Sequence, residues 1–336
     1  MLLKLRYLFL LLRFLSYRKV FNYAQLYLSY HFSTSKPLFK KHLLPAFISI
    51  EPTDVCQLEC PECPVGRRHD QIKNGFQLNE SSFRKTIDEL QSTLMHVIFY
   101  FQGEPLLNKN VSNYINYAHK KKIYTSTSTN AQALNTEFAK SLVLSGLDKL
   151  IISIDGSTQE VYEKYRVGGK LQKAMDGVKY VQEWKQKLKS VTPIIEIQFV
   201  VFKTNEHQLD DMRALAKELK VERLVFKTAQ LYDFENGNPL LTSLEKYARY
   251  ALGEDGKYHI KNKLPNKCLR LWSGAVINSK GDLVPCCFDK DSKHSFGNIS
   301  TQSFTDTWHN KKASNFRESI LKNRKQYEMC RNCTSK

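Results

Sequence analysis

The stretch AFISIEPTDVCQLECPECPVG, residues 46–66, joins a short apolar run to a loop that carries three cysteines. The first part, AFISIEP, predicts a buried strand, because a short apolar run there ends at a proline. The loop places Cys56, Cys60 and Cys63 at C-x3-C-x2-C spacing. Three thiolates are one ligand short of filling a tetrahedral metal site. We therefore predict a site directly after this strand, with its fourth ligand elsewhere in the chain or a position left open.

The alternation of strand and helix patterns continues along residues 47–230. Apolar runs predict strands at 46–52, 96–101, 124–130, 149–155, 194–202 and 223–230. Amphipathic segments between them predict helices at 81–91, 111–122, 136–146, 157–190 and 206–220. Such alternation is typical of an α/β fold with a parallel sheet or barrel. Six units fall short of the eight of a complete barrel, so we expect a partial (β/α)6 barrel of the TIM type, with the last helix undetermined.

Polar residues follow the predicted strands at the points where they end. Besides the cysteine loop, these are Gly103–Glu104, Thr129–Asn130, Ser153–Asp155 and Thr228. In βα folds, ligands bind at the carboxyl ends of the strands. We therefore expect five separate polar clusters to meet at one mouth of the barrel.

All eight cysteines fall into two groups, three near residue 60 and five between residues 268 and 333. In a chain of 336 residues with 42% hydrophobic residues, such tight spacings favour metal or cluster ligation in a reducing cytosol over a disulfide framework. A zinc site in the first loop would recruit His69 as its fourth ligand. Zinc sites more often use two separated pairs, whereas three thiolates from one loop suit a 4Fe–4S cluster with one open iron. An open iron at a barrel mouth would bind a small chelating molecule.

The second group lies in a segment with a different pattern. Residues 275–287, AVINSKGDLVPCC, predict a β-hairpin with SKGD at its turn, and residues 303–321 predict a helical region. So small an α+β module lacks a core of its own and would be stapled by a metal. Four thiolates suit zinc as well as an iron–sulfur cluster, so a zinc ribbon is the alternative here.

The cysteine loop after the first strand, with QGEP at residues 102–105 after the second, resembles the radical S-adenosylmethionine (radical SAM) enzymes. The resemblance implies that Cys56, Cys60 and Cys63 hold a 4Fe–4S cluster whose open iron chelates S-adenosylmethionine (SAM). It also implies that Gly103 and Glu104 contact the SAM amino group. The family commonly has two glycines before this glutamate, whereas here Gln102 takes the place of the first.

The same resemblance implies further SAM contacts and a reaction. Thr129 and Ser153 would contact the ribose or the carboxylate of SAM, and Arg166 would contact the carboxylate. The electron from the reduced cluster would cleave SAM to methionine and a 5′-deoxyadenosyl radical that abstracts hydrogen from the substrate. The sequence assigns no further catalytic residue.

The C-terminal cysteines are similar in pattern to the twitch form of the SPASM extension of radical SAM peptide-modifying enzymes and dehydrogenases. This resemblance implies one auxiliary 4Fe–4S cluster on Cys268, Cys286, Cys330 and Cys333, with Cys287 left over. The full SPASM extension needs more cysteines for a second auxiliary cluster than the chain has. We thus divide the chain into an N-terminal helical segment (1–45), a radical SAM partial barrel (46–235) and an auxiliary-cluster domain (236–336).

The formal net charge of +18 is strongest at the N-terminus, where no Asp or Glu precedes Glu51. Arg6, Arg13 and Arg18 interrupt every window of the about 20 apolar residues that a membrane span needs, and Arg13 interrupts any signal-peptide core. Two interpretations remain for this segment: an amphipathic helix on an anionic membrane surface, or a helix packed on the domain. The remaining positive charge is spread thinly and matches no nucleic-acid-binding motif.

These observations favour a cytoplasmic radical SAM enzyme, an oxidoreductase or maturase. Under the first interpretation of the N-terminal segment, residues 1–35 would place it at the anionic inner face of a membrane. We expect a one-electron donor such as flavodoxin or ferredoxin, and a peptide or a small molecule as substrate. The absence of a cobalamin domain disfavours a methyltransferase. The competing hypothesis is a basic RNA-binding or RNA-modifying iron–sulfur protein, although the sequence disfavours a nucleic-acid partner.

Overall fold

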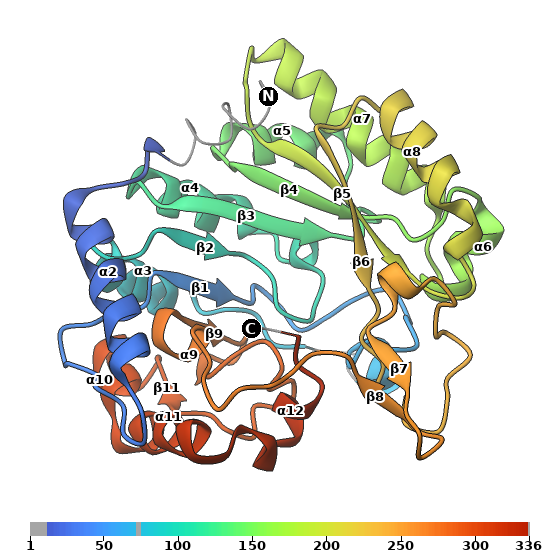
Figure 1. The fold of residues 1–336 in the computed structure, drawn as a ribbon. Coiled ribbons are helices and arrows are strands. Elements are labelled where there is room, and N and C mark those ends of the chain that lie inside the picture. The colour runs from blue at the N-terminus through green and yellow to red at the C-terminus, as the bar shows by residue number, and fades with distance from the viewer. Residues whose placement is uncertain (1–11, 72–74, 335–336) are drawn as a thin grey trace.

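A computed structural model describes residues 12–71 and 75–334 of the chain. Six parallel strands follow one another in one sheet, and the last of the six is an outer strand of that sheet (Figure 1). In chain order they are β1 (Phe47–Ile50), β2 (His96–Ile98), β3 (Tyr124–Thr129), β4 (Lys149–Ser153), β5 (Ile194–Val201) and β6 (Arg223–Thr228). Each strand pairs in parallel with the next. The predicted α/β fold with a partial barrel is confirmed.

The helices between the strands lie along one side of the curved sheet (Figure 1). They are α3 (Glu80–Leu90), α4 (Val111–Lys120), α5 (Thr136–Leu144), α6 (Gln159–Tyr165), α7 (Leu171–Lys187) and α8 (Leu209–Glu218). After β6, residues 229–269 form a 3-10 turn (Glu245–Tyr247) and the hairpin β7 (Tyr250–Leu252) and β8 (Tyr258–Ile260), but no α-helix. The sixth unit therefore lacks the helix that the sequence left undetermined.

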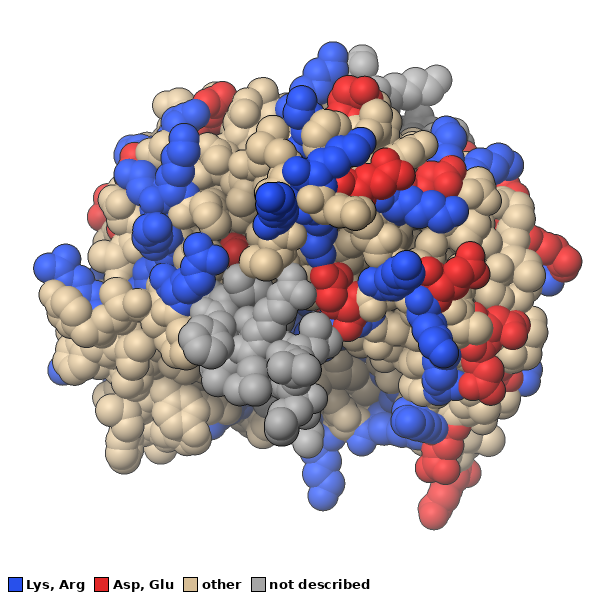
Figure 2. Space-filling view, turned by 90° about the horizontal axis from the view of Figure 1, so that it is seen from above, with Lys and Arg blue, Asp and Glu red and all other residues tan. Residues whose placement is uncertain are grey.

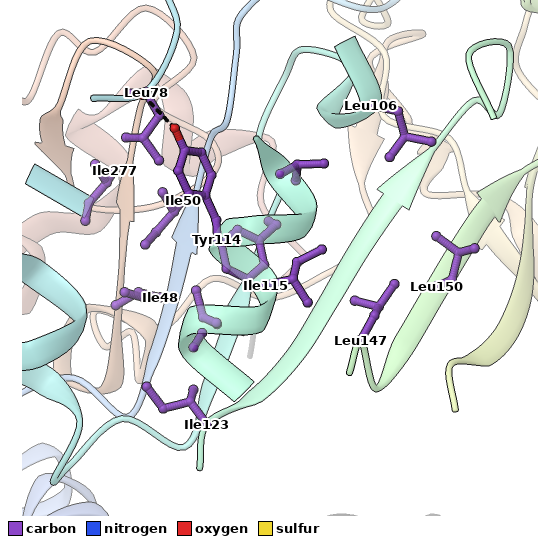
Figure 3. Packing of buried hydrophobic residues seen from close by; sticks show 14 of the residues in the cluster. Ile48, Ile50, Leu78, Leu106, Tyr114, Ile115, Ile123, Leu147, Leu150 and Ile277 are labelled. Carbon is purple, nitrogen blue, oxygen red and sulfur yellow. Dashed lines mark hydrogen bonds between the residues drawn. The ribbon is translucent and has the colours of Figure 1, made fainter. Parts of the chain in front are cut away.

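Alternate positions along the strands divide the sheet into two faces. Ile48 and Ile50 of β1 belong to the core beneath the helices, together with Tyr114, whose hydroxyl donates to the carbonyl of Leu78 at 3.1 Å (Figure 3). On the other face, Ser128 of β3, Ser153 of β4 and Gln198 of β5 line a cavity. The apolar face thus packs against the helices, and the other face is available to ligands.

The C-terminal segment joins the same sheet. The remaining elements are α9 (Arg270–Ser273), β9 (Gly274–Ile277), β10 (Asp282–Val284), β11 (Gly297–Asn298), α10 (Phe304–His309), α11 (Lys311–Asn323) and α12 (Glu328–Arg331). The predicted hairpin is present as antiparallel β9 and β10, and β9 also pairs in parallel with β1, Ile48 lying opposite Ala275. Sequence analysis did not predict the pairing of β9 with β1, because a hairpin pattern does not reveal which edge of a sheet the hairpin joins.

The core of the barrel continues into the C-terminal segment. Trp272, Phe304 and Trp308 belong to the same buried cluster as Ile48, and the Trp308 indole N–H donates to the carbonyl of Leu43 at 3.1 Å. The expectation that a metal staples this module therefore needs a correction. The module lacks a separate core, as expected, but it shares the core of the barrel and does not depend on a metal alone.

The N-terminal helix α2 (Tyr17–Phe32) packs on the outside of the domain beside α9. It buries a mostly polar face: Asn22 donates to the carbonyl of Leu44 at 2.7 Å, and the Trp272 indole N–H donates to Ser29 at 3.0 Å. The first eleven residues of the predicted amphipathic segment lie outside the described residues. In the part of the chain that the structure describes, no helix is both long and apolar enough to cross a bilayer.

Charged side chains are dispersed over the visible face in Figure 2, with Asp and Glu among the Lys and Arg. The observation agrees with the thinly spread charge that the sequence indicates beyond its N-terminus.

We expect Trp308→Ala to lower the free energy of unfolding by about 3–5 kcal/mol, because it leaves a large cavity in the shared core. Urea denaturation of the cluster-free protein measures this change. Leu144→Ala is the matched control, since Leu144 is 57% exposed on α5 and contributes little to the core. A loss no larger than that of the control would mean that the C-terminal helices fold independently of the barrel.

Candidate functional site

A cavity of about 520 Å³ lies at the carboxyl ends of the strands. Every residue that sequence analysis assigned to the first cluster or to SAM lines it: Cys56, Cys60, Cys63, Gly103, Glu104, Thr129, Ser153 and Arg166. These residues come from the ends of β1, β2, β3 and β4 and from the turn after α6. The predicted meeting of polar clusters at one mouth is present in the structure.

The cysteine loop turns tightly after β1. The N–H of Cys63 donates to the carbonyl of Cys60 at 3.1 Å, and the N–H of Arg67 donates to the carbonyl of Cys63 at 2.9 Å. At Gly66, an added Cβ would lie 2.4 Å from the carbonyl oxygen of Cys60. Only glycine allows so close an approach, so Gly66 keeps the loop closed around its three thiols.

Glu51, at the end of β1, holds three segments with one buried carboxylate. One oxygen accepts the N–H groups of Gln102 at 2.9 Å and Gly103 at 3.2 Å, and the other accepts that of Ser279 at 3.1 Å. Burial raises the pKa of Glu51, and these donors counteract the rise. The loop also needs Gly103, where an added Cβ would lie 2.1 Å from the carbonyl oxygen of Thr53. Gln102, at the position of the missing glycine, makes no comparable demand on the backbone.

Glu104 is buried and linked to the end of β3. Its carboxylate accepts the Thr129 hydroxyl at 2.6 Å and the N–H groups of Asn130 at 2.8 Å and Leu106 at 3.1 Å. Burial raises the pKa of Glu104, and these hydrogen bonds oppose that effect. A carboxylate has about four lone-pair positions, so one stays available to a ligand. The hydroxyl proton of Thr129 is already donated to Glu104, and a SAM contact by Thr129 would use its remaining lone pair.

Arg166 lies between a carboxylate and a cysteine. Its Nε donates to Asp155 at 2.6 Å, and Asp155 also accepts the N–H of Val200 at 2.6 Å. Burial raises the pKa of the Cys60 thiol, and the charge of Arg166 beside it acts in the opposite direction. Burial likewise raises the pKa of Cys56 to about 12. Because cluster ligands must be thiolates, the cation of Arg166 favours the ligating form of Cys60.

A second, smaller cavity gathers four cysteines of the C-terminal segment: Cys268, Cys286, Cys330 and Cys333. Cys287 does not line it. This thiol instead accepts a hydrogen bond from Arg270 at 3.1 Å and packs against an apolar group formed by Phe101, Val276 and Val284. The structure thus brings together the four cysteines that the resemblance assigned to one cluster, and Cys287 lies outside this group.

The donor sets of both cavities fit iron–sulfur clusters. Three thiols with an adjoining polar cavity leave one iron open to SAM, and four thiols can fill a cluster. Arg324 also lines the second cavity: one of its terminal nitrogens donates to the Cys333 thiol at 3.3 Å, and its Nε is buried without an acceptor. Within residues 12–71 and 75–334, no three His, Cys, Asp or Glu side chains converge on the position of a single metal ion.

A third cavity, of about 470 Å³, has lining residues in common with both sites. It shares Pro64, Gln230, Tyr232 and Lys290 with the first cavity and Phe288 and Met329 with the cysteine cavity. Its lining comes from the cysteine loop, the segment after β6, the turn after β10 and the region of α12. A substrate entering here would approach the SAM site from the side of the C-terminal cysteines.

Sequence analysis missed the roles of Glu51, Asn130 and Arg324. Glu51 carried a usable signal, since it is a carboxylate directly after a predicted strand. Asn130, whose amide donates to the Cys56 thiol at 3.5 Å, was noted only as a strand-end residue. Arg324 had no signal, because its contact with Cys333 depends on how the C-terminal segment folds back.

Two protein-family models match the chain. Residues 50–216 match the radical SAM superfamily, and residues 268–334 match SPASM, an iron-sulfur cluster-binding domain. The PqqA peptide cyclase of Bradyrhizobium diazoefficiens is 25% identical over 263 residues, which cover 72% of this chain and 67% of that protein. The Fe-coproporphyrin III synthase of Methanosarcina barkeri is 28% identical over 172 residues, or 51% of this chain and 41% of that protein.

Solved structures of similar fold include Streptococcus suis SuiB bound to the precursor peptide SuiA, with a TM-score of 0.60 and 16% identity over 82% of this chain and 67% of that chain. Another is anSMEcpe with bound AdoMet and the Cp18Cys peptide, with a TM-score of 0.58 and 17% identity over 86% of this chain and 88% of that chain. BtrN in complex with AdoMet has a TM-score of 0.51 and 19% identity, covering 87% of this chain and 94% of that chain. At such identities the likeness establishes the fold.

We expect Glu51→Gln to destabilise the protein by about 1–3 kcal/mol, because the amide NH₂ would face backbone N–H groups that need an acceptor. Urea denaturation measures the change. Glu254→Gln in the exposed β7–β8 turn is the control and should have no measurable effect. Equal stability of the two variants would show that Glu51 does not hold the three segments together.

Proposed function

Because this chain belongs to the radical SAM superfamily and carries a SPASM iron–sulfur region, we propose that the cavity at the barrel mouth is where SAM and substrate react. The enzyme uses a 4Fe–4S cluster, SAM and auxiliary iron–sulfur chemistry. When bound, the reduced cluster supplies the electron that cleaves SAM to methionine and a 5′-deoxyadenosyl radical, which abstracts hydrogen from the substrate. The observation that carries the proposal is that three loop cysteines and five candidate SAM contacts line a single cavity.

We assign the ligands of the two clusters by cavity. Cys56, Cys60 and Cys63 would hold the SAM-binding cluster. Cys268, Cys286, Cys330 and Cys333 would hold one auxiliary cluster, and this leaves Cys287, hydrogen-bonded to Arg270, as a non-ligand. Seven ligands and one spare thiol account for all eight cysteines, so a second auxiliary cluster has no thiolates left.

The SAM contacts follow from the groups that remain available in the cavity. The backbone of Gly103 and the free lone pair of Glu104 would meet the SAM amino group. Ser153, at the end of β4, would meet the ribose or the carboxylate. Arg166 would add positive charge near the carboxylate, while its ion pair with Asp155 holds it in place. Thr129 would act chiefly by orienting Glu104.

A peptide is the substrate class that we favour. Relatives of this chain include a PqqA peptide cyclase and, among solved structures, SuiB with its precursor peptide. The first and third cavities have four lining residues in common, so a peptide bound in one would reach the border of the other. Oxidation of a small molecule is the second candidate. No relative reported above supports the RNA-binding alternative.

We further propose three regions along the chain: residues 1–45, the SAM barrel 46–235, and the auxiliary-cluster region 236–336 that shares its core. The chain would act as an oxidoreductase or maturase in the cytoplasm, with flavodoxin or ferredoxin as its one-electron donor. Its N-terminal part would lie at the anionic inner face of a membrane. Residues 1–45 would then determine the location of the enzyme, and residues 46–235 would carry out the SAM chemistry.

The membrane proposal rests on the outward face of α2. Tyr17, Val20, Phe21, Leu28 and Phe32 are exposed on it, Tyr17 by 76% and Phe32 by 68%. Surface helices of globular proteins ordinarily bury their apolar face and expose the polar one. Here three of the four buried side chains, Lys19, Asn22 and Ser29, are polar and only Leu26 is apolar. The exposed side is thus more apolar than expected for a helix whose outer face meets only water.

Cations surround this apolar face of α2. Exposed basic side chains precede, interrupt and follow it, namely Arg13, Arg18, Lys36, Lys40 and Lys41, and no acidic residue occurs before Glu51. Aromatic side chains can enter the interface of a bilayer while the cations meet anionic head groups. Each cation near such a surface contributes about 1 kcal/mol, and this supports an anionic bilayer as the partner.

We expect anaerobic, reconstituted protein to turn SAM into 5′-deoxyadenosine and methionine when it receives a strong one-electron reductant. Cys63→Ala should abolish this, because the cluster loses a ligand. Glu104→Ala should weaken SAM binding at least about tenfold, since hydrogen bonds to a charged group contribute about 1.5–3 kcal/mol, and should retain iron. Equilibrium dialysis with SAM and iron analysis separate the two effects. Loss of iron in Glu104→Ala would contradict the assignment of Glu104 to SAM.

We expect the full-length protein to sediment with phosphatidylglycerol vesicles and progressively less as salt rises. The double variant Phe21→Ser, Phe32→Ser should bind at least about tenfold more weakly, because each Phe contributes about 1.5–3 kcal/mol on burial. Leu144→Ser, on another exposed apolar side chain, is the control. Point variants are preferable to deleting residues 1–30, since α2 buries Leu26 against Leu43 and Ala46. Equal binding by the double variant and the control would contradict the membrane role of α2.

A further inference from the structure

Arg324 is a buried cation at the second cavity, the one lined by four cysteines of the C-terminal segment. Its side chain is 1% exposed and lines that cavity with the four cysteines. One guanidinium nitrogen donates to the Cys333 thiol at 3.3 Å, and another donates to the carbonyl of Lys267 at 2.9 Å. The third, Nε, is buried and has no acceptor. The guanidinium of Arg324 thus donates one hydrogen bond to a cavity thiol and one to a backbone carbonyl.

No carboxylate among the described residues lies within ion-pair distance of Arg324. A buried charge without a counter-charge is strongly destabilising. The groups that can supply negative charge here are the cysteines of the cavity. An anionic group bound by four thiolates would balance the cation and give the Nε–H an acceptor.

Arg317 is an instructive contrast because it is equally buried, at 1% exposure. Two of its guanidinium nitrogens donate to the carbonyls of Leu271 and Trp308, and the third is buried without an acceptor, as is Nε of Arg324. The Arg317 guanidinium also lies 4.1 Å from the ring centres of Phe39 and Trp308. It does not line the cysteine cavity. Aromatic ring faces stabilise the buried positive charge of Arg317. The positive charge of Arg324 lies beside cysteine thiols instead.

We propose that Arg324 is a positioning residue of the auxiliary cluster that raises its reduction potential. This rests on the proposed ligand set Cys268, Cys286, Cys330 and Cys333. One-electron reduction adds one negative charge to the cluster and forms or breaks no bond. A fixed cation with N–H donors to a ligand sulfur stabilises the more negative, reduced form over the oxidised one. The auxiliary cluster is thereby poised to accept an electron inside the protein.

The test isolates the auxiliary cluster in a Cys56→Ala, Cys60→Ala, Cys63→Ala background. Its reduction by dithionite is followed by electron paramagnetic resonance across a range of potentials. Arg324→Gln should make reduction about tenfold less favourable, because the variant removes the fixed positive charge beside the ligand sulfur. For a one-electron couple this is about 59 mV lower in midpoint potential. Arg324→Lys, which keeps the charge, should stay near the parent value. Arg317→Gln should lower stability and leave the potential unchanged.

Each outcome decides the matter. An iron-bearing Arg324→Gln protein with the parent potential overturns the proposal, as does an equal drop in Arg324→Lys, since the charge would not be the cause. If Arg324→Gln loses the cluster while Arg324→Lys and Arg317→Gln keep it, the charge at position 324 serves cluster assembly and the proposed effect on the potential is overturned. If all three lose it, the loss reports folding and the proposal fails. Absence of iron in the parent itself would refute the ligand set and so the proposed function.

Discussion

The buried carboxylate of Glu51 is the interaction on which the site depends. It stands at the end of β1, the strand that pairs with β2 on one side and with β9 on the other. By accepting N–H groups from the loop after β2 and from the β9–β10 turn, it joins the SAM-binding mouth to the C-terminal segment. The cysteine loop begins a few residues later, so one strand end sets the relative positions of both candidate cluster sites.

Charged side chains lie beside the cysteines at both candidate cluster sites. At the mouth, Glu104 holds Thr129 and Asn130 in place while retaining a lone pair for a ligand, and Arg166 is held by Asp155 beside Cys60. At the C-terminal cavity, Arg324 has cysteines in place of a carboxylate. In both sites a guanidinium lies beside thiols that burial would otherwise keep protonated, which favours the thiolates that iron–sulfur clusters need.

Much of this organisation could be predicted from the sequence. The strand and helix pattern gave the partial barrel, because parallel strands covered by helices have a strong periodic signal. The spacings of Cys56, Cys60 and Cys63 and of the C-terminal cysteines identified two sets that the structure brings together. The sequence could not reveal that β9 pairs with β1, that Trp308 shares the barrel core or that Arg324 reaches Cys333. These depend on long-range packing, which leaves no local pattern. The polarity of α2 was ambiguous for a similar reason, since only the packed structure shows which face is covered.

The most direct test of the account is the iron and acid-labile sulfide content of anaerobically reconstituted protein, with Mössbauer spectra of each variant. The account predicts about eight irons per chain, because two clusters contain four irons each. Replacing Cys56, Cys60 and Cys63 together by alanine should halve this number and leave one cluster, and replacing Cys268, Cys286, Cys330 and Cys333 should leave the other. Zinc in place of the residual iron of the first variant, or an unchanged iron count in either, would contradict it.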